Sequence, residues 1–300
     1  MTRYEPAVDL DALTAIDVHV HIEVDAHGEQ SLPRHITEAA SAYFGASAEK
    51  PGLDAVADYY RERRTAAVVF TVDSQTQTGH PAISSAEIAA GAARHNDVLI
   101  PFGSVDPRAG LTAVETARRL IDDSGVRGFK FHPTVQGFDP SDVQHYPLYE
   151  VLQDAGMVAL FHTGQTGIGV GVPGGAGFRL ALSNPMLLDV VAADFPDLQI
   201  IMAHPSVPWQ DEALSVATHK QNTWIDLSGW SPKYFPKELV RYANSVIKDR
   251  VLFGSDFPLL TPDRWLRDAE AAELFKPEVL PGILKDNAAR LLGLTGETRS

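Results

Sequence analysis

The chain has 300 residues, a length that suits one large domain or two small ones. Its 25 basic and 39 acidic side chains give a net charge of −14, which argues against nucleic acid or an anionic membrane as a partner, because both attract basic surfaces. It contains no cysteine, so disulfides, thiolate nucleophiles and thiolate metal ligands are excluded, and this composition fits a cytoplasmic protein.

Short apolar runs predict eight β-strands along the chain, most of them rich in Val, Ile and Phe. Helix-like stretches separate these runs, and this alternation predicts parallel strands joined by helical crossovers. Eight such units predict a closed (β/α)₈ barrel, with an open doubly wound sheet as the alternative. The predicted strands are Ala15–Ile22, Ala66–Asp73, Val98–Asp106, Val126–Pro133, Val158–Gly164, Gln199–Ser206, Thr223–Gly229 and Val251–Pro258.

Local signals mark where several of the intervening helices begin. Ser84-Ser85-Ala86-Glu87 has the form of a capping box. Three other positions join an N-cap residue to a proline at the first helical position. These are Asn184-Pro185, Ser231-Pro232 and Thr261-Pro262.

Two segments interrupt the alternation of strand and helix. Glu23–Pro51 is too long for a simple connection, and we expect this insertion to form a lid or an extra hairpin over the mouth of the barrel. Thr163–Gly177 contains seven glycines and is predicted to be an active-site loop. No linker or repeat divides the chain, so residues 1–300 are predicted to form a single domain.

The first predicted strand carries the clearest chemical signal. Alternation along a strand places Asp17, His19 and His21 on one face, and two imidazoles two residues apart can bind one divalent metal ion. Asp17 is expected in a lower layer of the barrel, where it supports a neighbouring residue. Three further histidines, His132, His162 and His204, fall at the carboxyl ends of predicted strands, where the active sites of such barrels lie.

The same alternation suggests a complete set of metal ligands. If His19, His21, His162 and Asp256 all face the inside of the barrel, three imidazoles and one carboxylate converge there. This donor set suits one divalent ion, with Zn²⁺ expected and Mn²⁺ or Fe²⁺ as alternatives. An ion with an open position lowers the pKa of bound water to ~7.

Several ordered motifs carry a resemblance to a known family. Asp-x-His-x-His at 17–21, Gly-Phe-Lys-Phe-His-Pro at 128–133 and Gly-Ser-Asp-Phe-Pro at 254–258 resemble the amidohydrolase superfamily. The chain is most similar to the branch that contains aminocarboxymuconate semialdehyde decarboxylase and related aromatic-acid decarboxylases and hydrolases. The resemblance implies a one-metal barrel with His19, His21, His162 and Asp256 as ligands. It also implies that His204 is catalytic, and Asp256 is a second candidate for acid–base chemistry.

Four other residues are candidate substrate contacts. Lys130 is predicted to be an interior charge or a substrate contact, the alternative being the carboxylated lysine that bridges two ions in other members of the superfamily. His132 is expected to face the substrate or to orient a nearby loop. Arg179 is the anion-binding candidate of the glycine-rich segment, and Trp230 belongs to a group of aromatic residues that follow strand ends and can line a pocket.

The motifs allow two reactions on a small aromatic or acyl substrate. The first is hydrolysis of a carbon–carbon bond, because the chain most resembles aryl β-ketoacyl-CoA hydrolases. For that substrate, a local basic rim would consist of Arg34, Arg179, Lys233 and Lys237. The alternative is non-oxidative decarboxylation of an aromatic or enol acid, which uses the same ligands. A binding protein without catalysis is a third possibility, and the resemblance also implies a homo-oligomer.

Overall fold

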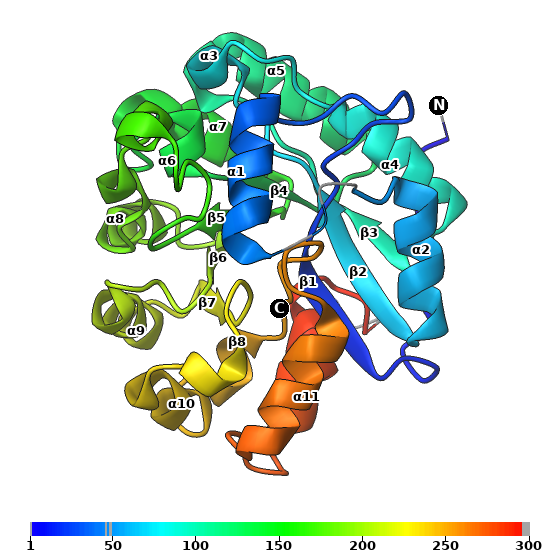
Figure 1. The fold of residues 1–300 in the computed structure, drawn as a ribbon, viewed down its shortest axis with the longest axis vertical. Helices are drawn as coiled ribbons and strands as arrows, with labels where there is room; N and C mark the ends of the chain where they lie inside the picture. Colours follow the sequence, from blue (N-terminus) through cyan, green and yellow to red (C-terminus); the bar gives the residue numbers. More distant parts are fainter. Residues whose placement is uncertain (1, 46, 48–49, 296–300) are drawn as a thin grey trace.

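The computed structural model describes residues 2–45, 47 and 50–295, and within them eight parallel strands form the centre of the molecule (Figure 1). Helices surround the strands, so the predicted closed barrel is confirmed. The strands are β1 (Ala15–His21), β2 (Thr65–Phe70), β3 (Leu99–Pro101), β4 (Gly128–Phe131), β5 (Val158–His162), β6 (Gln199–Ala203), β7 (Thr223–Asp226) and β8 (Val251–Leu252).

The eight strands form two hydrogen-bonded groups, and two isolated bridges between these groups close the barrel. Strands β1 to β3 pair in sequence order, and so do β4 to β8. Parallel bridges at Val20–Phe257 and Gly103–Phe129 join the two groups, which makes the ring continuous. β3 and β8 are shorter than predicted, because after Pro101 and Leu252 the chain contributes only isolated bridges and single hydrogen bonds to its neighbours.

The outer helices and turns follow the predicted alternation. Ser84 and Thr261 cap their helices through their side chains, as predicted. At Ser231 the hydroxyl makes no cap, because it donates instead to Asp268 at 2.6 Å. The α-helices are α1 (Arg34–Phe44), α2 (Leu53–Glu62), α3 (Gln75–Thr78), α4 (Ser85–Arg94), α5 (Leu111–Arg119), α6 (Pro133–Gln136), α7 (Tyr146–Asp154), α8 (Met186–Asp194), α9 (Gln210–His219), α10 (Lys237–Ala243), α11 (Pro262–Ala272) and α12 (Asn287–Leu291). The shorter turns are η1 (Pro107–Ala109), η2 (Leu120–Ser124), η3 (Val143–His145), η4 (Pro173–Gly177), η5 (Leu180–Ser183), η6 (Pro232–Tyr234), η7 (Lys248–Arg250) and η8 (Gly282–Asp286).

An irregularity in β1 decides which of its side chains face the interior. The register against β2 shifts between Asp17 and Val20, and the two faces of the strand exchange there. Asp17 accepts a hydrogen bond at 2.7 Å from the hydroxyl of Tyr60 on α2, outside the ring of strands. The prediction that Asp17 shares a face with His19 is therefore wrong. Asp17 does support a neighbour, because it also accepts the backbone N–H of Ser255 at 2.9 Å.

The insertion after β1 contains a short hairpin and a helix. Val24 and Gln30 form an antiparallel bridge, and α1 follows (Figure 1). Lys50 lies 3.3 Å from Glu23, so an ion pair joins the two ends of the insertion. Residues 46, 48 and 49 of the predicted lid lie outside the described residues, as do residues 1 and 296–300 of the predicted domain.

None of the described helices combines the length and the apolar composition needed to cross a membrane.

The connection between α8 and the strands depends on one buried amide. The Asn222 side chain donates to the carbonyls of Ala192, Phe195 and Leu198 at 3.0 to 3.2 Å. We expect Asn222→Ala to lower the free energy of unfolding by ~2–3 kcal/mol, because buried carbonyls lose their donor. Urea unfolding followed by circular dichroism measures this change. Asn96→Ala, which removes one exposed bond to Glu5, is the control; equal losses in both variants would contradict the prediction.

Candidate active site

Three side chains bring their ligand atoms together at the carboxyl end of the barrel. His19 Nε2 and His21 Nε2 are 3.2 Å apart, and Asp256 Oδ1 lies 3.4 Å and 3.2 Å from them. Atoms that all lie ~2.0–2.2 Å from one ion are separated by ~3.0–3.5 Å, so these spacings fit a shared divalent cation. His19, His21 and Asp256 thus form a candidate metal site.

The environment of His19 selects the tautomer that a metal ligand needs. Its Nδ1 lies 2.9 Å from the Asp226 carboxylate, so Nδ1 carries the proton and Nε2 offers its lone pair to the site. Burial, followed by the charge of Lys130, lowers the pKa of His19 to about 3, so the ring is neutral at pH 7. Burial alone would raise the pKa of Asp226, but the interactions with His19 outweigh it and hold this pKa well below its usual range.

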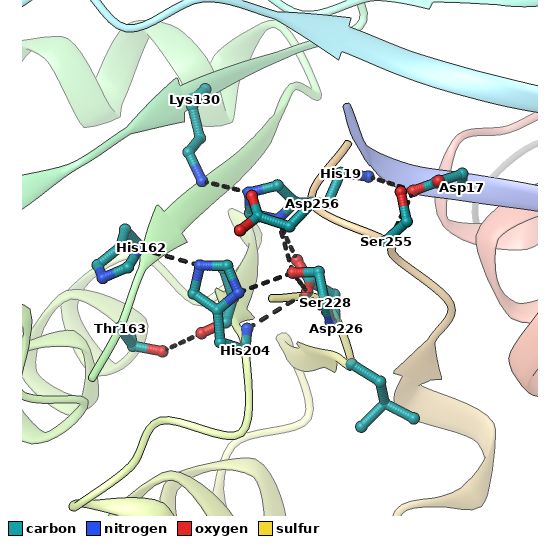
Figure 2. A network of polar contacts seen from close by, with 12 residues as sticks. Asp17, His19, Lys130, His162, Thr163, His204, Asp226, Ser228, Ser255 and Asp256 are labelled. Carbon is teal, nitrogen blue, oxygen red and sulfur yellow. Dashed lines mark hydrogen bonds and ion pairs between the residues drawn. The ribbon is translucent and has the colours of Figure 1, made fainter. Parts of the chain in front are cut away.

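Asp226 and Ser228 also connect His19 to His204 (Figure 2). The Ser228 hydroxyl donates to Asp226 and lies 2.8 Å from His204 Nδ1. A protonated Nδ1 of His204 can therefore donate to Ser228, which leaves Nε2 as the basic nitrogen. Sequence reasoning did not select either residue, although an aspartate in the apolar run Ile225-Asp226-Leu227 is an available signal.

The backbone turns two of the predicted residues toward the site. His204 and Asp256 have φ values of 71° and 75°, in the left-handed region that side chains other than glycine rarely adopt. By simple alternation His204 would follow Met202, which packs outward against the helices. The left-handed turn after β6 instead places the His204 ring against His162 and Ser228. Such backbone strain is concentrated at functional sites.

His162 and His132 form the next layer of the site. His162 Nδ1 lies 3.0 Å from His204 Nε2, and the His132 ring stacks on His162 with centroids 3.8 Å apart. His162 does not belong to the close group of ligand atoms formed by His19, His21 and Asp256, so its role as fourth ligand stays a prediction. Its Nε2 is buried without a partner among the described residues, which leaves coordinating capacity at this ring.

Lys130 is buried beneath the candidate metal site. Its Nζ lies 3.1 Å from His19 Nε2, and burial lowers its pKa to about 7 (Figure 2). Its role as an interior charge or a substrate contact stays a prediction. Lys130 is not among the described residues that line the cavity above the site.

A cavity of about 450 Å³ opens above these residues. His21, His132, His162, His204 and Asp256 contribute to its floor, and Trp230 and Tyr234 to its wall. The predicted insertion contributes Tyr43 and Phe44 of α1, and the segment after β5 contributes Gln165 to Ile168. The remaining walls combine apolar side chains, such as Leu32 and Leu260, with polar ones, such as Ser31 and Arg264.

The predicted basic residues lie elsewhere. Arg179 is exposed and does not line the cavity, although its carbonyl accepts a hydrogen bond from Thr134. Arg34, Lys233 and Lys237 are also absent from the described lining. Among the described residues, the one arginine or lysine that lines it is Arg264, near the start of α11, which sequence reasoning did not select because nothing in its local pattern marks it.

The fold and the site together define a (β/α)₈ barrel protein with a histidine- and aspartate-rich candidate metal site at the carboxyl ends of its strands. The chain belongs to the amidohydrolase family, because the family model described as Amidohydrolase matches residues 16–294. A search of curated proteins found no match.

Solved structures share this fold at low sequence identity. An uncharacterized TIM-barrel protein from Bordetella bronchiseptica is 24% identical, with a TM-score of 0.72 over 94% of this chain and 99% of that one. A 5-carboxyvanillate decarboxylase from Novosphingobium aromaticivorans with bound manganese is 14% identical, with a TM-score of 0.64 over 96% and 100% of the two chains. A 2,6-dihydroxybenzoate decarboxylase from Rhizobium is also 14% identical, with a TM-score of 0.64 over 94% and 99%.

The bridge through Ser228 leads to a testable expectation for His204. We expect Ser228→Ala to lower kcat ~10–100-fold and to change the pH profile of kcat, because His204 Nδ1 loses its nearest partner. Steady-state kinetics across pH measures both effects. Ser206→Ala is the control, since Ser206 is also buried and its hydroxyl contacts Thr163 and the backbone carbonyl of His204 rather than the His204 ring. An unchanged pH profile in Ser228→Ala would contradict the assignment.

Proposed function

We propose that the protein is a metal-dependent decarboxylase of small aromatic or enol acids. The observation that carries this proposal is the position of His204, an imidazole supported by Ser228 and Asp226, beside the candidate metal site on the floor of a cavity lined by apolar and polar side chains. Further support is that two of the similar solved structures are described as aromatic-acid decarboxylases, one with manganese bound.

The ion would be held by His19, His21 and Asp256, with His162 as the expected fourth ligand, and when bound it supplies a Lewis acid that stabilises negative charge on substrate oxygens. Manganese and zinc both suit these donors. Trp230 and Phe44 provide apolar surface for a planar ring.

Residues of the chain transfer the proton in this reaction. The bond between the ring carbon and the carboxylate breaks, its electron pair stays on the ring carbon, and carbon dioxide leaves. A proton must reach that same carbon. His204 Nε2 and Asp256 are the two groups on the cavity floor proposed to deliver it, and each must first take up that proton from solvent water, because neither the resting Nε2 nor the resting carboxylate carries one.

Hydrolysis of a β-ketoacyl thioester is the second candidate. It is favoured by the run Ser228-Gly-Trp-Ser-Pro-Lys-Tyr-Phe-Pro236, which resembles aryl β-ketoacyl-CoA hydrolases and whose Trp230 and Tyr234 line the cavity. In that reaction water adds its oxygen to the ketone carbon, the carbon–carbon bond breaks, and a proton goes to the carbon of the departing thioester.

One experiment separates the two reactions. The protein loaded with manganese or zinc is incubated in ¹⁸O-labelled water with 2,6-dihydroxybenzoate, 5-carboxyvanillate and an aryl β-ketoacyl thioester. A decarboxylase releases carbon dioxide and leaves the aromatic product without ¹⁸O. Labelled aromatic acid from the thioester, with no carbon dioxide from either acid, would replace decarboxylation by hydrolysis.

A further inference from the structure

Arg264 is the only lysine or arginine among the described residues that line the cavity. We propose that Arg264 is a specificity-determining residue that binds a carboxylate of the substrate distinct from the reacting one. The substrate class is then an aromatic acid with two carboxylates, and this part of the inference rests on the proposed decarboxylase function.

The guanidinium of Arg264 has unused hydrogen-bonding capacity. It donates no hydrogen bond to any described residue, and its nearest acid is Asp268, at 3.8 Å. Asp268 already accepts the hydroxyl of Ser231 at 2.6 Å and also lies 3.8 Å from Arg267. One carboxylate thus faces two guanidinium groups, and neither guanidinium is within hydrogen-bond distance of it. By contrast, Arg63 donates to both oxygens of Asp263 at 2.9 Å.

The helix that carries Arg264 is firmly attached to the barrel. Its neighbour Trp265 is completely buried and donates its indole N–H to the carbonyl of Leu227 at 2.9 Å. Thr261 caps the same turn by accepting the backbone N–H of Arg264. Because this backbone is fixed while the Arg264 side chain is 46% exposed, the guanidinium can turn toward a ligand without a change in the fold.

The acidic side chains that line the cavity make the positive charge of Arg264 important for binding an anion. Glu23 also lines the cavity, but it is paired with Lys50 at 3.3 Å, and Asp256 belongs to the candidate metal site. The chain carries a net charge of −14, so a substrate with two negative charges enters an unfavourable field unless a cation receives it. A planar guanidinium matches a carboxylate through two parallel hydrogen bonds.

Binding of unreactive probes tests this role without turnover. Benzoate is compared by calorimetry with benzene-1,3-dicarboxylate and benzene-1,4-dicarboxylate, using the manganese-loaded protein. We expect at least one diacid to bind about tenfold more tightly than benzoate. Arg264→Met should remove this preference, so that the diacids and benzoate bind with similar affinity. Arg267→Met is the matched control: it lies on the same helix at the same distance from Asp268, but its side chain is 69% exposed and outside the described cavity lining.

Each outcome decides one of the two proposals. The role of Arg264 is overturned if neither diacid binds better than benzoate, if Arg264→Met keeps the preference, or if Arg267→Met loses it equally. If the preference depends on Arg264 and the labelling experiment detects no carbon dioxide, the decarboxylase function fails and anion binding by Arg264 stands. If carbon dioxide forms and the preference is absent, the decarboxylase function is retained and the role of Arg264 is rejected.

Discussion

Replacing Asp256 with asparagine is expected to lower kcat ~10³-fold while the barrel stays folded. Asparagine keeps the shape of the side chain and removes the negative charge that faces His19 and His21 at 3.4 Å and 3.2 Å. One of the two groups proposed to deliver the proton is lost with it, and general acid–base groups of this kind contribute ~10²–10⁴-fold. Steady-state kinetics at saturating metal measures the loss.

The control for this variant is Asp263→Asn, on α11 and outside the described cavity lining. We expect Asp263→Asn to retain activity and both variants to show the circular dichroism spectrum of the parent protein. Full activity in Asp256→Asn would contradict the assignment of the site. A loss of folded signal in that variant would show instead that Asp256 is needed for the structure.

Removing the divalent ion is the second change expected to have a large effect. A chelator should abolish turnover, and manganese or zinc should restore it, because three of the proposed ligands converge on one position. Metal affinity is measured directly by titration of the chelated protein. We expect Asp226→Asn to weaken this affinity ~10–100-fold, since Asp226 orients the His19 ring at 2.9 Å without being one of the proposed ligands.

His27→Ala provides the comparison for the metal titration, because His27 is exposed and lies outside the candidate metal site. Its affinity for manganese should equal that of the parent chain. The metal assignment would fail if the chelated protein kept its activity, or if His21→Ala bound manganese as tightly as His27→Ala.

The barrel was predictable because each of its units carries its own local signal. A short apolar run forms each strand, and residues such as Ser84 and Thr261 mark helix starts through hydrogen bonds within a few positions. The placement of Asp17 was not predictable, because the register shift in β1 depends on its pairing with β2. Alternation alone assumes a regular strand.

The candidate site was predictable only in part, for a similar reason. His19, His21 and Asp256 occupy positions that motif spacing identifies, and the structure brings their ligand atoms together. For Asp226, the apolar run around it signals a buried carboxylate, but its partners His19 and Ser228 became apparent only in the folded structure. An anion-binding residue was sought at Arg179, yet Arg264 is the cation that reaches the cavity wall, because loop and helix placement is a property of the assembled barrel.

The left-handed backbone at His204 and Asp256 has a consequence for protein engineering. Each such residue costs ~1–2 kcal/mol relative to glycine, which adopts this geometry freely. Selection for heat resistance alone acts against this backbone strain and does not protect the two side chains on which the proposed chemistry depends. Any thermostabilisation campaign needs an activity screen at every round.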